Sequence, residues 1–196
     1  MSIHSLDYFA PDAFEVQVSE MLVATSDGSD ALLDASVSEV LRLVKDQLKM
    51  DVVFVSEFAD GRNVFRRVET RPGAEVVEVG ASRALEESFC QRVIDGRMPR
   101  LVHDVAALPN KDELPPTAFP VGAHMSTPIV LADGRIYGTF CCFSFSANDA
   151  LTERDLKKLE MCAQLTARKI DAQRAAEVER ASEAWRLQQQ GDRGRS

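Results

Sequence analysis

The stretch "VGAHMSTPIVLADGRIYGTFCCFSF", residues 121–145, contains two runs of β-branched and aromatic residues on either side of the tetrapeptide ADGR. Runs of this kind predict strands, here over 123–131 and 136–145. Asp133-Gly134 predicts a two-residue hairpin turn between them, because Asp and Gly accept positive φ angles. The stretch therefore predicts an antiparallel hairpin, and with it a fold built on a sheet.

The tetrapeptide ADGR occurs a second time, at 59–62, between two further strand-like runs. The sequence therefore predicts a second hairpin with the same turn chemistry. Helical spacing and short β-rich runs give the other elements. Helices are predicted over about 12–24, 29–49, 82–95 and 152–187, and the remaining strands over 51–58, 62–70, 75–79 and 100–105. The segment 106–120 holds four prolines and is predicted to be an irregular loop.

Hairpins combined with helices gathered mostly at both ends of the chain predict an α+β fold, an antiparallel sheet carrying a helical layer. The last helix is expected to begin with Thr152 as its N-cap and Asp155 three residues later. Beyond Ile170 its apolar stripe thins and charges of both signs intervene. That part is predicted to be an exposed helix or a partner-binding coil.

Strand alternation separates the adjacent cysteines Cys141 and Cys142, because neighbouring residues point to opposite faces of a sheet. A two-residue hairpin at Asp133-Gly134 also fixes the pairs on each face. One face is expected under the helices and carries Leu131 with Ile136, Ile129 with Gly138, Thr127 with Phe140, Met125 with Cys142, and Ala123 with Ser144. The other is expected to form a pocket wall and carries Val130 with Tyr137, Pro128 with Thr139, Ser126 with Cys141, and His124 with Phe143.

This arrangement argues against a disulfide or a shared metal at Cys141–Cys142. Packing is the favoured role of Cys142, since buried free cysteine behaves as a small hydrophobe. For Cys141, packing or pocket lining is favoured over redox chemistry, which stays open because His124 lies close enough to lower its pKa.

Composition excludes several classes of partner. The 196-residue chain has a net charge of −8 and a pI of about 5.0, which disfavours nucleic acid. No run is apolar enough to span a membrane, and no signal peptide begins the sequence.

The four cysteines form neither a CxxC pair nor a zinc spacing. They are expected to be reduced thiols of a cytoplasmic protein, without a metal site. No hydrolase, P-loop or dinucleotide motif is present, so no catalytic residue is assigned and an enzyme is the less favoured class.

Four blocks of the sequence resemble, in order, consecutive blocks of bacterial GAF domains: "LKMDVVFVSEFADGRNVFR", "ESFCQRVIDGRMPRLVHDV", the stretch 121–145 and "LTERDLKKLEMCAQLTARKI". The resemblance implies a six-stranded antiparallel sheet with a helical layer on one face and a small-molecule pocket on the other. It also implies sensory or regulatory work through a homodimer built from terminal helices. The expected division is an N-terminal helix and linker over 1–27, a GAF-like domain over 28–172, and an exposed helical extension with a frayed tail over 173–196.

Candidate ligand-binding residues follow from the pocket face and from the helix that commonly borders the pocket in GAF folds. They are Phe89, Cys90, His103, His124, Ser126, Thr139 and Cys141. The cofactor is unknown. Covalent bilin attachment is not expected, because Cys90 is followed by Gln91 and not by His. The motif of cyclic-nucleotide-binding members is not found either.

Three functions remain open at this point. The leading one is a sensor that binds an unknown small molecule and acts on a separate or fused output domain, since no output block is found in the sequence. The second is a thiol-based reductase of the free methionine sulfoxide type, which the four cysteines allow. The third is a dimerising adaptor whose pocket is filled by its own side chains.

Overall fold

A computed structural model describes residues 13–14, 16–18 and 30–193. Its sheet has six antiparallel strands in the order β3-β2-β1-β6-β5-β4. The strands are β1 (Val52–Ala59), β2 (Arg62–Thr70), β3 (Ser82–Ala84), β4 (Leu101–Val102), β5 (His124–Val130) and β6 (Ile136–Phe143). This confirms the predicted α+β class and the six-stranded antiparallel sheet.

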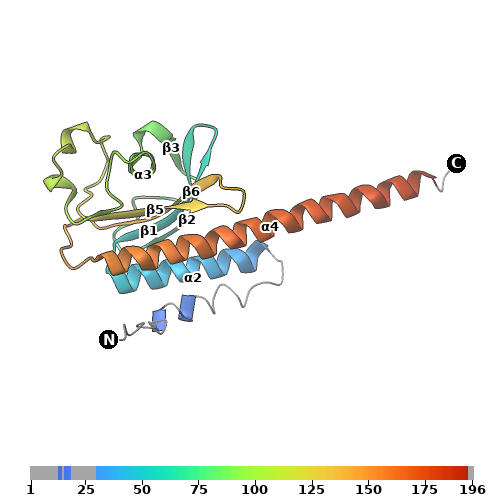
Figure 1. Cartoon of the computed structure of the whole chain (residues 1–196), viewed down its shortest axis with the longest axis horizontal. Helices are drawn as coiled ribbons and strands as arrows, with labels where there is room; N and C mark the ends of the chain where they lie inside the picture. The colour runs from blue at the N-terminus through green and yellow to red at the C-terminus, as the bar shows by residue number, and fades with distance from the viewer. Residues whose placement is uncertain (1–12, 15, 19–29, 194–196) are drawn as a thin grey trace, which may run out of the picture.

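Two long helices cover one face of the sheet. They are α2 (Asp30–Leu48) and α4 (Glu153–Arg193), which lie side by side below the strands in Figure 1. The opposite face carries the short helix α3 (Phe89–Ile94) and the loops around it (Figure 1). Three single 3-10 turns accompany α3, at Leu85–Glu87, Val105–Ala107 and Lys111–Glu113. The predicted loop over 106–120 is thus irregular, apart from the end of the 3-10 turn at Val105–Ala107 and the whole of the turn at Lys111–Glu113.

Two apolar clusters separate the faces. The helix-face cluster contains residues of both helices and of the central strands, including Leu41, Leu159, Val53, Met125, Phe140 and Cys142. The pocket-face cluster contains Val52, Phe54, Phe65, Cys90, Cys141 and Phe143. Cys141 and Cys142 therefore lie in different clusters, as strand alternation predicted.

The two ADGR tetrapeptides form different turns. Ala59 pairs directly with Arg62, and Asp60 and Gly61 both have positive φ angles, 50° and 70°, as in a type I′ turn. At the second site Leu131 N–H donates to Arg135 O over 2.9 Å, and only Gly134 has a positive φ, 82°. The second loop is therefore one residue longer, and the prediction of identical turns is wrong.

This longer loop shifts the β5–β6 register by one residue. Pairing follows the prediction from His124–Phe143 to Ile129–Gly138, but Val130 pairs with Ile136. The bulge turns Tyr137 onto the helix face, where Arg174 of α4 lies 5.4 Å from its ring centroid. The predicted pairs Val130–Tyr137 and Leu131–Ile136 are therefore wrong, and so is the placement of Tyr137 on the pocket wall.

The predicted strand over 75–79 is also wrong. This segment is a loop bounded by Gly73 and Gly80, each with a φ of 84°, and Val76 N–H donates back to Ala74 O over 2.8 Å, so the chain turns locally instead of running along a neighbouring strand. Gly80 N–H donates to Phe65 O over 2.8 Å and so fixes the loop against β2. The third strand of the sheet is β3, which pairs with the start of β2.

The predicted helix over 82–95 is correct only in its second half. Its first residues form β3 and a 3-10 turn, and α3 begins at Phe89. Ser88 supplies the N-cap, because its Oγ accepts a hydrogen bond from Gln91 N–H over 3.1 Å. The sheet pairing of 82–84 overrides the helical spacing that Leu85, Phe89 and Val93 have in the sequence.

The helices at the two ends agree with the sequence. Asp155 Oδ2 accepts hydrogen bonds from Thr152 N–H and Oγ1–H over 2.9 and 2.7 Å, which confirms the predicted start of α4. Residues 13–14 and 16–18 are helical, with Phe14 and Val18 buried; the rest of the predicted helix over 12–24 lies outside the described residues. The C-terminal half of α4 projects beyond the sheet and α2 (Figure 1).

Candidate functional site

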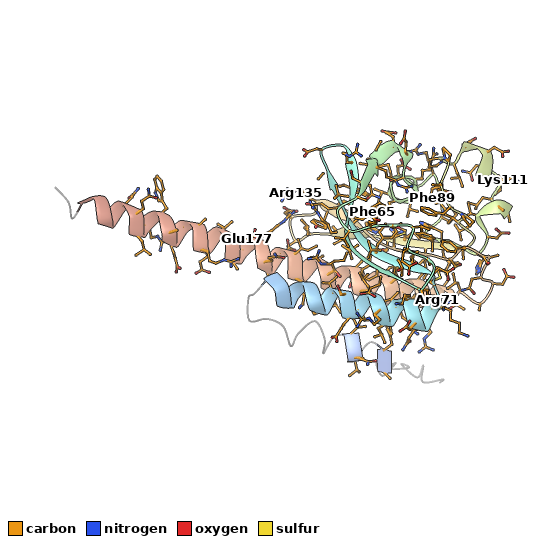
Figure 2. The ribbon with its side chains drawn as sticks, turned by 180° about the vertical axis from the view of Figure 1, so that it is seen from behind. Phe65, Arg71, Phe89, Lys111, Arg135 and Glu177 are labelled. Carbon is orange, nitrogen blue, oxygen red and sulfur yellow. The ribbon has the colours of Figure 1, made fainter. Side chains whose placement is uncertain are left out.

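A small cavity lies on the pocket face between the sheet and the segment around α3. Its volume is about 40 Å³. Figure 2 shows two of its residues, Phe65 and Phe89, on the side of the sheet away from α2 and α4. The lining residues come from β1, β2, β3, β5, β6, from α3 with its N-cap, and from the loop before β5: Phe54, Asn63, Phe65, Arg83, Ser88, Phe89, Cys90, Thr117, Phe119, Val121, His124, Cys141 and Phe143.

Aromatic rings form most of the cavity wall. Phe54 and Phe65 meet edge to face at 5.0 Å between centroids. Phe119, from the loop before β5, stacks on Phe143 at 5.3 Å with their planes 7° apart. The guanidinium of Arg83 lies 5.8 Å from the centroid of the Phe65 ring. The site therefore combines an apolar wall with one cationic side chain.

A cluster of polar side chains lies among these rings. Sγ of Cys141 and Nε2 of His124 are 3.3 Å apart, and both residues are buried. Ser56 and Thr139 hydroxyls are 3.0 Å apart on the neighbouring strands. Within the part of the chain that the structure describes, Nδ1 of His124, Oδ1 of Asn63 and Oγ of Ser126 are buried without a hydrogen-bond partner. Such atoms are costly to bury unless something completes their hydrogen bonding.

Burial and neighbours set the protonation of this cluster. Burial lowers the pKa of His124 to about 4, so its imidazole is neutral at pH 7. Hydrogen bonding with the Cys141 thiol, and then with Thr139 and Asn63, holds the pKa of Cys90 below its usual range despite burial. Burial, together with the neighbouring Cys90, raises the pKa of Cys141. Cys90 is therefore the more acidic thiol, and Cys141 stays protonated beside it.

The cavity, the two-faced sheet and the flanking helices agree with the sequence match. A family model described as "GAF domain" matches residues 27–171, most of the chain. The chain belongs to the GAF domain family. Its position in this family confirms the resemblance noted in the sequence and accounts for the fold. No curated protein sequence matches the chain at a significant level.

Solved structures of GAF proteins from bacteria share this fold. The GAF domain of an Acinetobacter phosphoenolpyruvate-protein phosphotransferase is 15% identical with a TM-score of 0.62, covering 83% of this chain and 96% of that chain. Free methionine-R-sulfoxide reductase from Neisseria meningitidis is 16% identical with a TM-score of 0.63, covering 89% and 99%. A bacteriophytochrome from R. palustris is 16% identical with a TM-score of 0.68, covering 95% and 42%. At these identities the likeness shows the GAF fold alone.

The structure brings together most of the residues that the sequence singled out. Phe89, Cys90, His124 and Cys141 line the GAF cavity. Ser126 and Thr139 are buried on the same face, beside Cys141 and Cys90 respectively. His103 lies apart from this cavity: its Nδ1 is 3.2 Å from Asn148 O, in the loop before α4.

Sequence reasoning missed several lining residues of the GAF pocket. Asn63, Phe54 and Phe65 belong to the β1–β2 hairpin, and Phe119 to the Pro-rich loop. The sequence does hold a signal for Asn63: it lies two residues from Phe65 in a predicted strand, so the two side chains share one face of the sheet. The structure shows Asn63 buried on that face. Nothing in the sequence placed the loop around Phe119 over the sheet.

No group of three or more metal-ligating side chains lies together among residues 13–14, 16–18 and 30–193. Within the same residues, no helix is long and apolar enough to cross a membrane.

Proposed function

We propose that this chain is a bacterial, cytoplasmic GAF-type sensory domain that binds a small molecule in the pocket-face cavity and signals through its terminal helices as a homodimer. The observation that carries the proposal is a pair of buried polar atoms without partners, His124 Nδ1 and Asn63 Oδ1, on two side chains that line the cavity. A ligand with complementary donors and acceptors would satisfy these atoms and recover their desolvation cost.

The wall of the cavity suits a ligand with an apolar or planar part. Phe119 is half-buried and belongs to a loop without strands or long helices, so the cavity can enlarge by movement of that loop. The ligand would then order the loop by stacking with Phe119 and Phe143. Arg83 supplies a positive charge for a ligand that carries an acidic group.

A signal would be transmitted from the cavity to the helices through the central strands of the sheet. His124 and Cys141 lie on the pocket face of β5 and β6, and their neighbours Met125 and Cys142 pack in the helix-face cluster with α2 and α4. Ligand binding would favour one packing of these helices over another, by the difference in its affinity for the two states. The projecting half of α4 would carry that change to a second copy and to an output domain.

The decisive experiment is native mass spectrometry of the protein purified from its host, followed by release of any bound molecule. A stoichiometric small molecule in the wild type that is lost in His124→Gln supports the sensor. The matched control is His103→Gln, which removes a histidine outside the cavity. An empty cavity, with no melting shift across a metabolite library, contradicts ligand binding and leaves the ligand-free adaptor.

A second candidate is a thiol-based reductase of free methionine sulfoxide, which the pair of pocket thiols Cys90 and Cys141 favours. Incubation of the protein with free methionine-R-sulfoxide and dithiothreitol tests it. Methionine formation that depends on Cys90 supports the reductase. Equal rates for wild type, Cys90→Ser and buffer contradict it.

A further inference from the structure

Two thiols from distant parts of the chain meet at the cavity. Cys90 lies in the first turn of α3 and Cys141 in β6, and both line the same space. The helix α3 packs directly against β5 and β6. The other two cysteines, Cys142 and Cys162, belong to the helix-face cluster on the opposite side of the sheet. The fold therefore separates the four cysteines into a pocket pair and a core pair.

The pocket pair has the groups needed for thiol oxidation. Hydrogen bonding with Cys141, and then with Thr139 and Asn63, lowers the pKa of Cys90, and the thiolate is the nucleophilic form of cysteine. Cys141 keeps its proton and lies 3.3 Å from the neutral His124 imidazole. Cys90 can thus attack an oxidant and become a sulfenic acid, and Cys141 can then react with that sulfenic acid to form a disulfide.

The core pair lacks these groups. Burial raises the pKa of Cys162 to about 12, and it raises the pKa of Cys142 as well. Neither residue lines the cavity. The two core cysteines therefore serve as internal references for the reactivity of the pocket pair.

The size of the cavity limits the oxidant. Its volume of about 40 Å³ is room for roughly three water-sized molecules, taking about 10–15 Å³ for each. Hydrogen peroxide is only slightly larger than water and fits this space without movement of the aromatic wall. Among small oxidants it also reacts readily with thiolates.

We propose that Cys90 and Cys141 form a reversible disulfide across the cavity in response to hydrogen peroxide, so that the pocket is a peroxide-responsive switch. This inference deepens the proposed sensory function, since it names a redox regulation of the same pocket.

In the first step the Cys90 thiolate attacks one peroxide oxygen, the O–O bond breaks, and Cys90 sulfenic acid and hydroxide form. In the second step Cys141 sulfur attacks the Cys90 sulfur, the S–O bond breaks, and the leaving hydroxyl takes the Cys141 proton to become water. A dithiol reductant reverses the product to two thiols.

The disulfide would join α3 to the central strand β6. That bond would cross the cavity that Cys90, Cys141 and His124 line. It would also limit movement of the segment between α3 and β5, which holds Phe119. Oxidation would therefore compete with binding of any larger ligand.

The test is peptide mapping of the full chain after titration with hydrogen peroxide, with free thiols blocked before digestion. The expected result is an intramolecular Cys90–Cys141 link, a loss of two hydrogens from the intact mass, and recovery with dithiothreitol. This measurement needs no variant, so misfolding of a mutant cannot obscure it. Cys90 and Cys141 that stay reduced at peroxide concentrations that oxidise Cys142 or Cys162 overturn the inference.

Variants assign the two steps. Cys141→Ser is expected to stop at the sulfenic acid, so a sulfenic-acid-specific probe labels Cys90, whereas Cys90→Ser should lose at least tenfold in oxidation rate. Cys142→Ser and Cys162→Ser are the matched controls and should react like the wild type. Cys90→Ser oxidising as fast as the wild type would overturn the inference.

The outcomes also separate this inference from the proposed function. If a ligand copurifies and the pocket thiols do not react with hydrogen peroxide, the sensor is supported and the switch is contradicted. A disulfide that forms in a protein with no copurifying ligand and no melting shift across a metabolite library supports the switch and removes the ligand-driven sensor. Oxidation of the pair by free methionine sulfoxide but not by peroxide overturns the switch in favour of the reductase.

Discussion

Nε2 of His124 lies 3.3 Å from Sγ of Cys141, so a neutral imidazole and a protonated thiol share one contact in the pocket face of the sheet. The two residues occupy neighbouring positions on β5 and β6, because His124 pairs with Phe143 and Ser126 pairs with Cys141. The other ring nitrogen of His124 has no partner. This histidine therefore links the protonation of the pocket to the stability of the domain.

His124 makes the stability of the domain depend on pH. Burial lowers its pKa from 6.5 to about 4. Between pH 4 and pH 6.5, His124 is therefore protonated in the unfolded chain but neutral in the folded protein. Its stabilising contribution is complete above pH 6.5 and is lost as the pH falls towards 4, by about 3 kcal/mol in all. Urea unfolding at several pH values should show this loss in the wild type. In His124→Gln the loss over the same range should be smaller by that amount, and equal losses would contradict it.

Gly138 allows β1 and β6 to approach closely. A Cβ atom at this position would lie 1.9 Å from Ser56 O, so the strands must separate to accept alanine. Gly138→Ala is expected to lower the free energy of unfolding by about 2–3 kcal/mol, as overpacking in a core does. Gly134→Ala is the control: it meets open space but has a φ of 82°, so about 1 kcal/mol is expected. Equal effects in urea unfolding would refute the close-approach argument.

The two faces of the sheet should respond differently to loss of an aromatic ring. Phe140 is fully buried in the helix-face cluster, so Phe140→Ala should cost about 3–5 kcal/mol. Phe119 is half-buried over the cavity and stacks on Phe143, so Phe119→Ala should cost only about 1 kcal/mol. The second variant should instead open the cavity, seen as faster hydrogen exchange in the segment 105–122. A larger stability loss in Phe119→Ala than in Phe140→Ala would contradict this division.

The projecting half of α4 is predicted to hold the proposed homodimer together. Val178 and Trp185 are 70% and 62% exposed and lie seven residues apart, so they share one helix face. A chain ending at Ala176 keeps the contacts of Arg174 with Tyr137 and Glu57 and should fold as a monomer. Light scattering after size-exclusion chromatography measures its mass against that of the full chain. A full-length Val178→Ser, Trp185→Ser variant controls for helix length, and a dimer that survives both changes would exclude this surface.

Local signals in the sequence predicted much of the fold. Thr152 and Asp155 lie only three residues apart in the chain and cap the start of α4 as expected. Strand alternation alone placed Cys141 and Cys142 on opposite faces, and family resemblance supplied the strand number. The failures came from pairings between distant segments. Residues 82–84 look helical but are paired with the start of β2, and 75–79 looks like a strand but lies between two glycines with positive φ.

The candidate site was predicted in part for the same reason. His124, Ser126 and Cys141 follow from the register of one hairpin. Cys90 and Phe89 came from the family resemblance. Asn63 and Phe119 come from another hairpin and from an irregular loop. Their arrival at the cavity depends on tertiary packing, for which the sequence offers no periodic signal.

The one-residue difference between the two ADGR loops has a consequence for how this domain can vary. Loop tips usually accept insertions and deletions, but the extra residue between Leu131 and Arg135 is what rotates Tyr137 onto the helix face. On that face the Arg174 guanidinium of α4 lies 5.4 Å from the centroid of the Tyr137 ring. Shortening this tip by one residue would turn Tyr137 away and leave Arg174 without its aromatic neighbour. The length of a surface turn is thus coupled to a contact that packs the last helix on the sheet, so a change in that length should be accompanied by a change at Arg174.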